Sequence, residues 1–157
     1  MSMASTIEFG TGNTPLNACP IRAEWILEGA PAARNAILSR SADGGACTLI
    51  WDCTAGLFNW VYDIDETVYV LEGSVVVRNE AGVTRRLGVG DTAFFPSGSK
   101  AVWHVESYVR KVAFCRNPVP APVMFAMRVA KKLARIAGFG QKSASGPPMF
   151  GMAGREL

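Results

Sequence analysis

The stretch G-L-F-N-W-V-Y-D-I-D-E-T-V-Y-V-L-E-G, residues 56–73, constrains the fold most strongly. Aromatic side chains recur at every second position, at Phe58, Trp60 and Tyr62, which is typical of a strand with one face buried in a crowded interior. After an acidic turn, residues 67–71 form a β-branched and aromatic run, and a glycine follows where the backbone can adopt an angle that other residues resist. The stretch therefore predicts two strands joined by a turn.

Similar short runs precede and follow this stretch. Glycine, proline, asparagine and aspartate separate the runs as they would at turns, and no helical period occurs before residue 120. Strands are predicted at residues 21–28, 36–41, 46–53, 74–78, 92–95, 101–105 and 109–114. Many short strands with regular turn signals predict an all-β sandwich or barrel.

The chain of 157 residues is long enough for one domain with a sizeable core. Residues 1–20 are polar and aperiodic, and they predict an extended N-terminal arm that pairs with a neighbouring strand or subunit. Residues 21–117 are predicted to form the β-barrel domain. Three prolines near residue 120 end it, and residues 118–157 are predicted to be a basic helix followed by a flexible tail.

The charge is distributed unevenly along the chain. Residues 1–115 contain 9 basic and 12 acidic residues, whereas residues 116–157 contain 7 basic and 1 acidic residue. The predicted helix, from Val123 to Gly138, has a basic stripe and an apolar arc. Residues 123–139 therefore suit a membrane surface or a partner protein, or they pack against the protein's own barrel or a second subunit. Without a recognition motif, four clustered cations do not indicate a nucleic-acid-binding protein.

The four cysteines lie at irregular spacings without a C-x-x-C motif. Free thiols are therefore expected, rather than a disulfide framework or a zinc site. The first 19 residues lack the basic start and apolar run of a secretory signal, and no apolar stretch approaches the length of a membrane span. These features predict a cytoplasmic protein.

The stretch at residues 56–73, followed by G-D-T-A-F-F-P-S-G at residues 90–98, resembles the two conserved segments of the cupin superfamily. More narrowly, the match from Trp25 to Phe114 resembles the (S)-ureidoglycine aminohydrolase-type cupins, also classed as domain of unknown function 861. The resemblance implies a double-stranded β-helix, the jelly-roll barrel of cupins, and a homodimer. It names a family without identifying a substrate.

Metal-binding cupins supply two histidines and a glutamate from the first segment and a third histidine from the second. Carried over position by position, Glu66 retains the glutamate, whereas Trp60 and Tyr62 replace the first two histidines and Ala101 replaces the third. One glutamate in such surroundings is a poor ligand set for zinc, iron or manganese. We therefore expect no metal cofactor.

The resemblance places an aromatic pocket with a single carboxylate inside the barrel. Such a pocket suits a small ligand with a cationic or amide nitrogen. In one hypothesis the protein is an enzyme, with Glu66 as general acid or base and Tyr62 as hydrogen-bond donor. In the other it is a non-catalytic binding or sensing module. The residues expected to bind the ligand are Trp60, Trp103, Tyr69 and Lys111.

An alternative without a ligand is equally open at this point. The aromatic side chains would fill a narrow barrel, and Glu66 would pair internally with Lys111, Arg110 or the hydroxyl of Tyr62. Strand alternation further predicts that Trp103 faces inward and that His104, the single histidine, faces outward.

Overall fold

The structure is a computed structural model that describes residues 7–136. Its chain divides into two compact units, residues 1–118 and residues 119–157, and each is described by itself. The strands are β1 (Asn17–Ala18), β2 (Ile26–Gly29), β3 (Ala33–Arg40), β4 (Ala46–Val61), β5 (Asp65–Asn79), β6 (Thr84–Gly88), β7 (Thr92–Phe95) and β8 (Lys100–Arg116). The first unit is all-β, as the sequence predicts.

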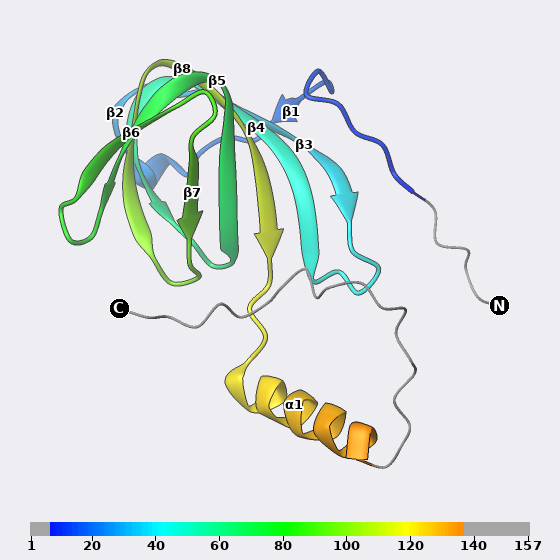
Figure 1. Ribbon diagram of the computed structural model, residues 1–157. Coiled ribbons are helices and arrows are strands. Elements are labelled where there is room, and N and C mark those ends of the chain that lie inside the picture. The colour runs from blue at the N-terminus through cyan, green and yellow to red at the C-terminus, as the bar shows by residue number, and fades with distance from the viewer. Residues whose placement is uncertain (1–6, 137–157) are drawn as a thin grey trace. The chain divides into compact units, whose positions relative to one another are not determined.

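Three long strands, β4, β5 and β8, form the centre of one antiparallel sheet in which β8 lies between the other two (Figure 1). Strand β8 pairs with both along its length, whereas β4 and β5 each continue through a bend, so that their two halves have different outer neighbours. The first half of β4 pairs with β3 and its second half with β2, while the first half of β5 pairs with β7 and its second half with β6. The sheet thereby folds into two layers.

Glycines occupy the bends. Gly73 in β5 has a φ of +68°, a left-handed conformation, and a Cβ atom there would overlap the carbonyl oxygen of Tyr108. In β4, a Cβ atom at Gly56 would lie 2.7 Å from the ring of Pro31. The register of the strand pairs shifts beside both glycines. Where separate strands were predicted on either side of these positions, the chain forms single strands that bend.

The predicted strand at residues 21–28 is only partly correct. Residues Ala23–Trp25 form a 3-10 helix, and β2 begins at Ile26. The side chain of Trp25 packs edge-on against Trp60, with ring centroids 5.5 Å apart, and the guanidinium of Arg22 lies over the indole of Trp25. Tertiary packing of this tryptophan thus outweighs the weak alternation of the segment.

The core lies between the two layers and is rich in valine and aromatic residues. Its most deeply buried large side chains are Phe58, Ile50, Val68, Val70, Val75, Val105 and Val109. Along β8, Ala101, Trp103 and Val105 are buried and His104 is exposed, which confirms the predicted alternation. The arrangement is a β-barrel filled with side chains.

The second unit contains the helix α1, Ala121–Ile136. It confirms the predicted helix but begins two residues earlier, because Pro122 is compatible with a first helical turn, where backbone N–H groups need no partner. The predicted stop at Gly138 and the predicted flexible tail lie outside the described residues. Within the described part of the chain, no helix is both long enough and apolar enough to cross a membrane.

Candidate functional site

Of the two aromatic residues at the histidine positions of the first segment, Tyr62 lies close to Trp103. Tyr62 follows β4 directly, and its hydroxyl oxygen accepts a hydrogen bond of 3.0 Å from Nε1 of Trp103. The ring of Tyr62 stacks on Phe95 with a centroid distance of 4.5 Å. Burial, together with the nearby charge of Glu66, raises the pKa of Tyr62 well above its ordinary value. Tyr62 therefore remains a neutral phenol that fills the barrel.

The carboxylate of Glu66 is held by the protein's own cation. Nζ of Lys111 donates a hydrogen bond to Oε1 of Glu66, and both side chains are nearly buried, with exposed fractions of 7% for Lys111 and 11% for Glu66. Nζ also lies 5.0 Å from the ring centroids of Trp51 and Trp103. An aromatic cage with one carboxylate suits a cation. Here that cation is Lys111, which is one of the three internal partners of Glu66 that the sequence suggested.

The remaining residues predicted for the barrel site differ in their placement. Trp60 is partly buried, and its ring contacts Trp25 and Trp51 edge-on. Tyr69 is 41% exposed and is not part of the cage. The indole Nε1 of Trp51 is buried and has no hydrogen-bond partner among the described atoms. The structure thus brings together Trp51, Trp103, Glu66 and Lys111, with Tyr62 beside them, and leaves Tyr69 apart.

The donor set of the barrel does not fit a transition metal. At the three histidine positions, Trp60, Tyr62 and Ala101 offer an indole, a neutral phenol and a methyl group, and the retained Glu66 is already bound by Lys111. Within residues 7–136, no three His, Cys, Asp or Glu side chains lie close enough together to hold a metal ion. We derive no metal chemistry for this site.

A pocket with a volume of about 520 Å³ opens beside the free edges of β6 and β7. Its floor consists of apolar core residues, Val77, Leu87, Phe95 and Ala101, so it reaches the position of the third cupin histidine. Its rim carries the charged side chains of Glu80, Arg85 and Lys100. Neither this pocket nor four others in the described part of the chain is lined by Trp60, Tyr62, Glu66, Trp103 or Lys111.

No pattern in the sequence predicts this pocket. Its walls come from β6, β7, the ends of β5 and β8, the β5–β6 loop and the β7–β8 loop, and only the fold brings these segments together. The one available signal was Ala101, where a small residue replaces a histidine and leaves space. Arg85 and Lys100 on the rim carry no motif that distinguishes them from other surface cations.

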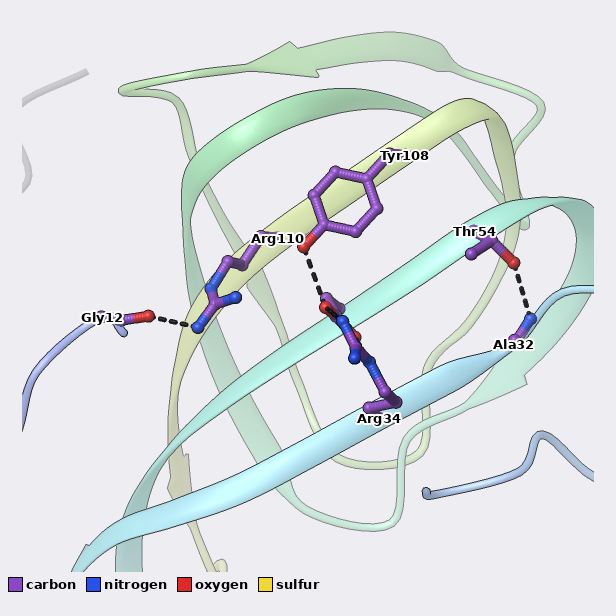
Figure 2. Close-up of polar contacts among 7 residues, drawn as sticks. Gly12, Ala32, Arg34, Thr54, Tyr108 and Arg110 are labelled. Atoms are coloured by element: carbon purple, nitrogen blue, oxygen red, sulfur yellow. Dashed lines mark hydrogen bonds and ion pairs between the residues drawn. The ribbon is translucent and has the colours of Figure 1, made fainter. Parts of the chain in front are cut away.

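A second polar cluster, also missed, lies on the outer side of β3, β4 and β8 (Figure 2). Asp52 is 1% exposed, accepts two hydrogen bonds from Arg34, of 3.0 and 2.5 Å, and accepts one of 2.8 Å from the hydroxyl of Tyr108. Burial alone would raise the pKa of Asp52, but the hydrogen bonds from Arg34 and Tyr108 outweigh burial and lower it. Nearby, Arg110 donates to the carbonyl oxygen of Gly12. The cluster fastens the N-terminal arm to the barrel.

Comparisons with known proteins agree with this architecture. Residues 40–113 match the EutQ-like cupin domain family. A protein of the DUF861 family from Pseudomonas syringae pv. tomato is 24% identical with a TM-score of 0.62, and the match covers 67% of this chain and 46% of that protein. The chain thus spans less than half the length of this relative.

Two further structures are similar to parts of the chain. One, described as ethanolamine utilization protein Q from Salmonella typhimurium, is 22% identical with a TM-score of 0.50, and the match covers 68% of this chain and 98% of that protein. A DUF861 protein from Thermotoga maritima is 41% identical with a TM-score of 0.39 over 41% of this chain and 73% of that protein. Comparison with curated protein sequences gives no match. The β-barrel of this chain therefore has the cupin fold, and residues 40–113 are similar to the EutQ-like cupin domain.

Proposed function

We propose that the cupin domain is a non-catalytic binding module for a small molecule with an apolar body and a carboxylate group. The observation that carries this proposal is the pocket beside β6 and β7, whose volume of about 520 Å³ lies within the range of pockets for small ligands. Its apolar floor suits the body of such a ligand, and its basic rim suits a carboxylate.

The rim combines two cations with one anion. Arg85 and Lys100 line the pocket and are exposed, and within residues 7–136 neither forms an ion pair. The carboxylate of Glu80 also lies on the rim, where its Oε2 atom accepts a hydrogen bond of 3.4 Å from the backbone N–H of Lys100. The excess of positive charge favours an anionic ligand, and the planar guanidinium of Arg85 matches the geometry of a carboxylate.

Screening small aliphatic and aromatic monocarboxylates by NMR against the full chain tests this proposal. A ligand is expected to shift the resonances of residues at the pocket floor, such as Leu87 and Ala101. Replacing Arg85 with Gln removes a charge-assisted hydrogen bond and is expected to weaken binding about tenfold or more. The matched control Arg78→Gln removes an exposed cation from β5 that does not line the pocket, and it should leave the affinity unchanged.

Two outcomes would contradict the proposal. In the first, no carboxylate binds, or Arg85→Gln and Arg78→Gln weaken binding equally, in which case the attraction is only the general charge of the surface. In the second, amines bind preferentially and shift the resonances of Trp51 and Trp103. That result would place the binding site at the aromatic cage around Lys111 instead.

The catalytic alternative is an enzyme on a small nitrogenous metabolite, which the resemblance to ureidoglycine aminohydrolase-type cupins implies. Glu66 would be the general acid or base, and Tyr62 would donate a hydrogen bond. The geometry favours binding over catalysis, because the carboxylate of Glu66 is engaged by Lys111 and the hydroxyl of Tyr62 is buried beside Trp103. The homodimer that the resemblance implies, and the cytoplasmic location, stay predictions.

We propose a second function for α1, which is binding to an anionic membrane surface. The helix contains four cations, Arg128, Lys131, Lys132 and Arg135, and no acidic residue. At 100° per residue, these cations fall on one stripe, and Phe125, Val129, Leu133 and Ile136 fall together on the apolar arc. A helix with a basic stripe and an aromatic and aliphatic face is typical of segments that lie in the interface of anionic lipid bilayers.

Co-sedimentation with lipid vesicles tests this second function. The full chain is expected to bind vesicles rich in phosphatidylglycerol more tightly than vesicles of phosphatidylcholine. Each basic residue near an anionic surface contributes about 1 kcal/mol, so Lys131→Glu with Lys132→Glu is expected to weaken binding at least about tenfold. The control variant Arg78→Glu with Arg85→Glu changes the net charge equally on the barrel. Equal losses in both variants would assign the binding to net charge rather than to α1.

A further inference from the structure

Two of the four cysteines are direct neighbours across the β4–β8 strand pair. In the antiparallel register, Cys47 near the start of β4 lies opposite Cys115 near the end of β8. Directly opposite residues in an antiparallel pair have Cα atoms about 4.5 or 5.5 Å apart, and both values lie within the range that a disulfide spans. Both cysteines also line the same pocket. Backbone geometry therefore already matches a disulfide.

The two thiols differ in their access to solvent. Cys47 is partly exposed, whereas Cys115 is buried. Both line a pocket of about 600 Å³, whose lining includes Arg40, Arg116, Asp65 and the hydroxyl-bearing residues Ser39, Ser41 and Thr48. The carboxylate of Asp65 pairs with Arg116, so the guanidinium of Arg40 leaves an excess of positive charge that suits an anionic reagent. Cys53, by comparison, is fully buried in the core, and burial raises the pKa of its thiol to about 12.

We propose that Cys47 and Cys115 form an intramolecular disulfide by exchange with a small anionic disulfide such as oxidised glutathione, which is admitted by the pocket at the ends of β4 and β8. The thiolate of Cys47 attacks one glutathione sulfur and expels the first glutathione thiolate. The thiolate of Cys115 then attacks the Cys47 sulfur and expels the second. The protein loses two electrons and two protons, and the glutathione disulfide gains both as two thiols.

The two steps are expected to differ in rate. Burial, and then the nearby charge of Glu66, raises the pKa of Cys115 to about 12. Only the thiolate is nucleophilic, so below that pKa the closing step is expected to accelerate about tenfold for each unit by which the pH rises. Near neutral pH, the mixed disulfide at Cys47 should therefore accumulate before the intramolecular bond forms.

The closed bond would join β4 to β8, the strand that carries Lys111 of the buried ion pair. Cys115 lies opposite Glu66 in the β5–β8 register, and Lys111 is four residues earlier on the same strand. A disulfide between positions 47 and 115 would also close a long loop, and the constraint on the unfolded chain stabilises the native state. Oxidation is expected to raise the unfolding temperature by about 5 °C or more.

Incubation of the full-length native protein with oxidised glutathione, followed by intact-mass analysis and peptide mapping, tests the proposal. Wild-type protein is expected to lose two hydrogen atoms and to yield a peptide pair linked through Cys47 and Cys115. Dithiothreitol should reverse both the mass change and the rise in unfolding temperature. The Cys115→Ser variant should stop at the glutathione adduct on Cys47, and the Cys47→Ser variant should form no bond to Cys115.

The Cys19→Ser variant provides the matched control, because Cys19 is partly exposed but lies outside the pocket. It should form the Cys47–Cys115 bond at the wild-type rate. The proposal is overturned if wild-type protein stays reduced or stops at the mixed disulfide at pH 9, or if the linked peptides contain another cysteine pair. Peptide mapping of the wild type decides this even where a serine variant fails to fold.

Discussion

Replacing Glu66 with Gln is expected to lower the free energy of unfolding by about 3–5 kcal/mol, because the ammonium group of Lys111 would be left buried without a counter-charge. The exposed fractions of 11% for Glu66 and 7% for Lys111 leave little water to solvate the remaining cation. Urea denaturation at neutral pH, followed by tryptophan fluorescence, measures this change.

Variants of Lys111, the ion-pair partner, test whether the role of Glu66 is structural or catalytic. Lys111→Met leaves the carboxylate unpaired and should destabilise the protein similarly, whereas the double variant Glu66→Gln with Lys111→Met removes both charges and should be more stable than the sum of the single effects. An unchanged stability in Glu66→Gln would contradict the structural role and return Glu66 to the position of candidate general acid or base.

The second large effect is expected at Gly73, where substitution by Ala should destabilise the barrel by more than about 2 kcal/mol. The left-handed backbone alone costs a residue with a Cβ atom about 1–2 kcal/mol. The new methyl group would also overlap the carbonyl oxygen of Tyr108, and a backbone atom cannot move aside as a flexible side chain can. Thermal unfolding followed by circular dichroism measures the loss.

Gly82 offers a matched control for this substitution. Its φ is +79°, close to that of Gly73, but a Cβ atom there would meet no other atom within 4 Å. Gly82→Ala should therefore show the backbone cost alone, about 1–2 kcal/mol. If the two alanine variants lose the same stability, the close approach of β5 to β8 at Tyr108 does not contribute.

Much of the fold follows from local patterns. The alternation at residues 58–62 and 101–105 correctly identified buried faces, because in a two-layered barrel each strand has one inward face. Strand ends were predicted less well. Gly73 marks a bend within β5 rather than an end, since a glycine permits a left-handed backbone angle equally in a turn and in a sharply bent strand. Whether hydrogen bonding resumes after the glycine depends on the partner strand.

The barrel interior shows a similar limit. The sequence identified Glu66 as a carboxylate that needs a partner, and it offered Lys111, Arg110 and Tyr62 as candidates. The choice among them depends on the β5–β8 register, in which Lys111 lies opposite Val70 and reaches Glu66 along the same face. Lys111 and Glu66 are 45 positions apart in the chain. No local period in the sequence encodes the β5–β8 register. The pocket lined by Arg85 likewise depends on strand pairing that no local pattern predicts.

The central position of β8 has a consequence for synthesis of the chain. The ribosome produces β4 and β5 before β8. The backbone N–H and C=O groups along one edge of each strand therefore stay unpaired until residues 100–116 emerge and insert between them. The nascent barrel therefore cannot close progressively from its N-terminus. Until its last strand arrives, the newborn chain exposes the sheet edges that attract chaperones and foster misassembly.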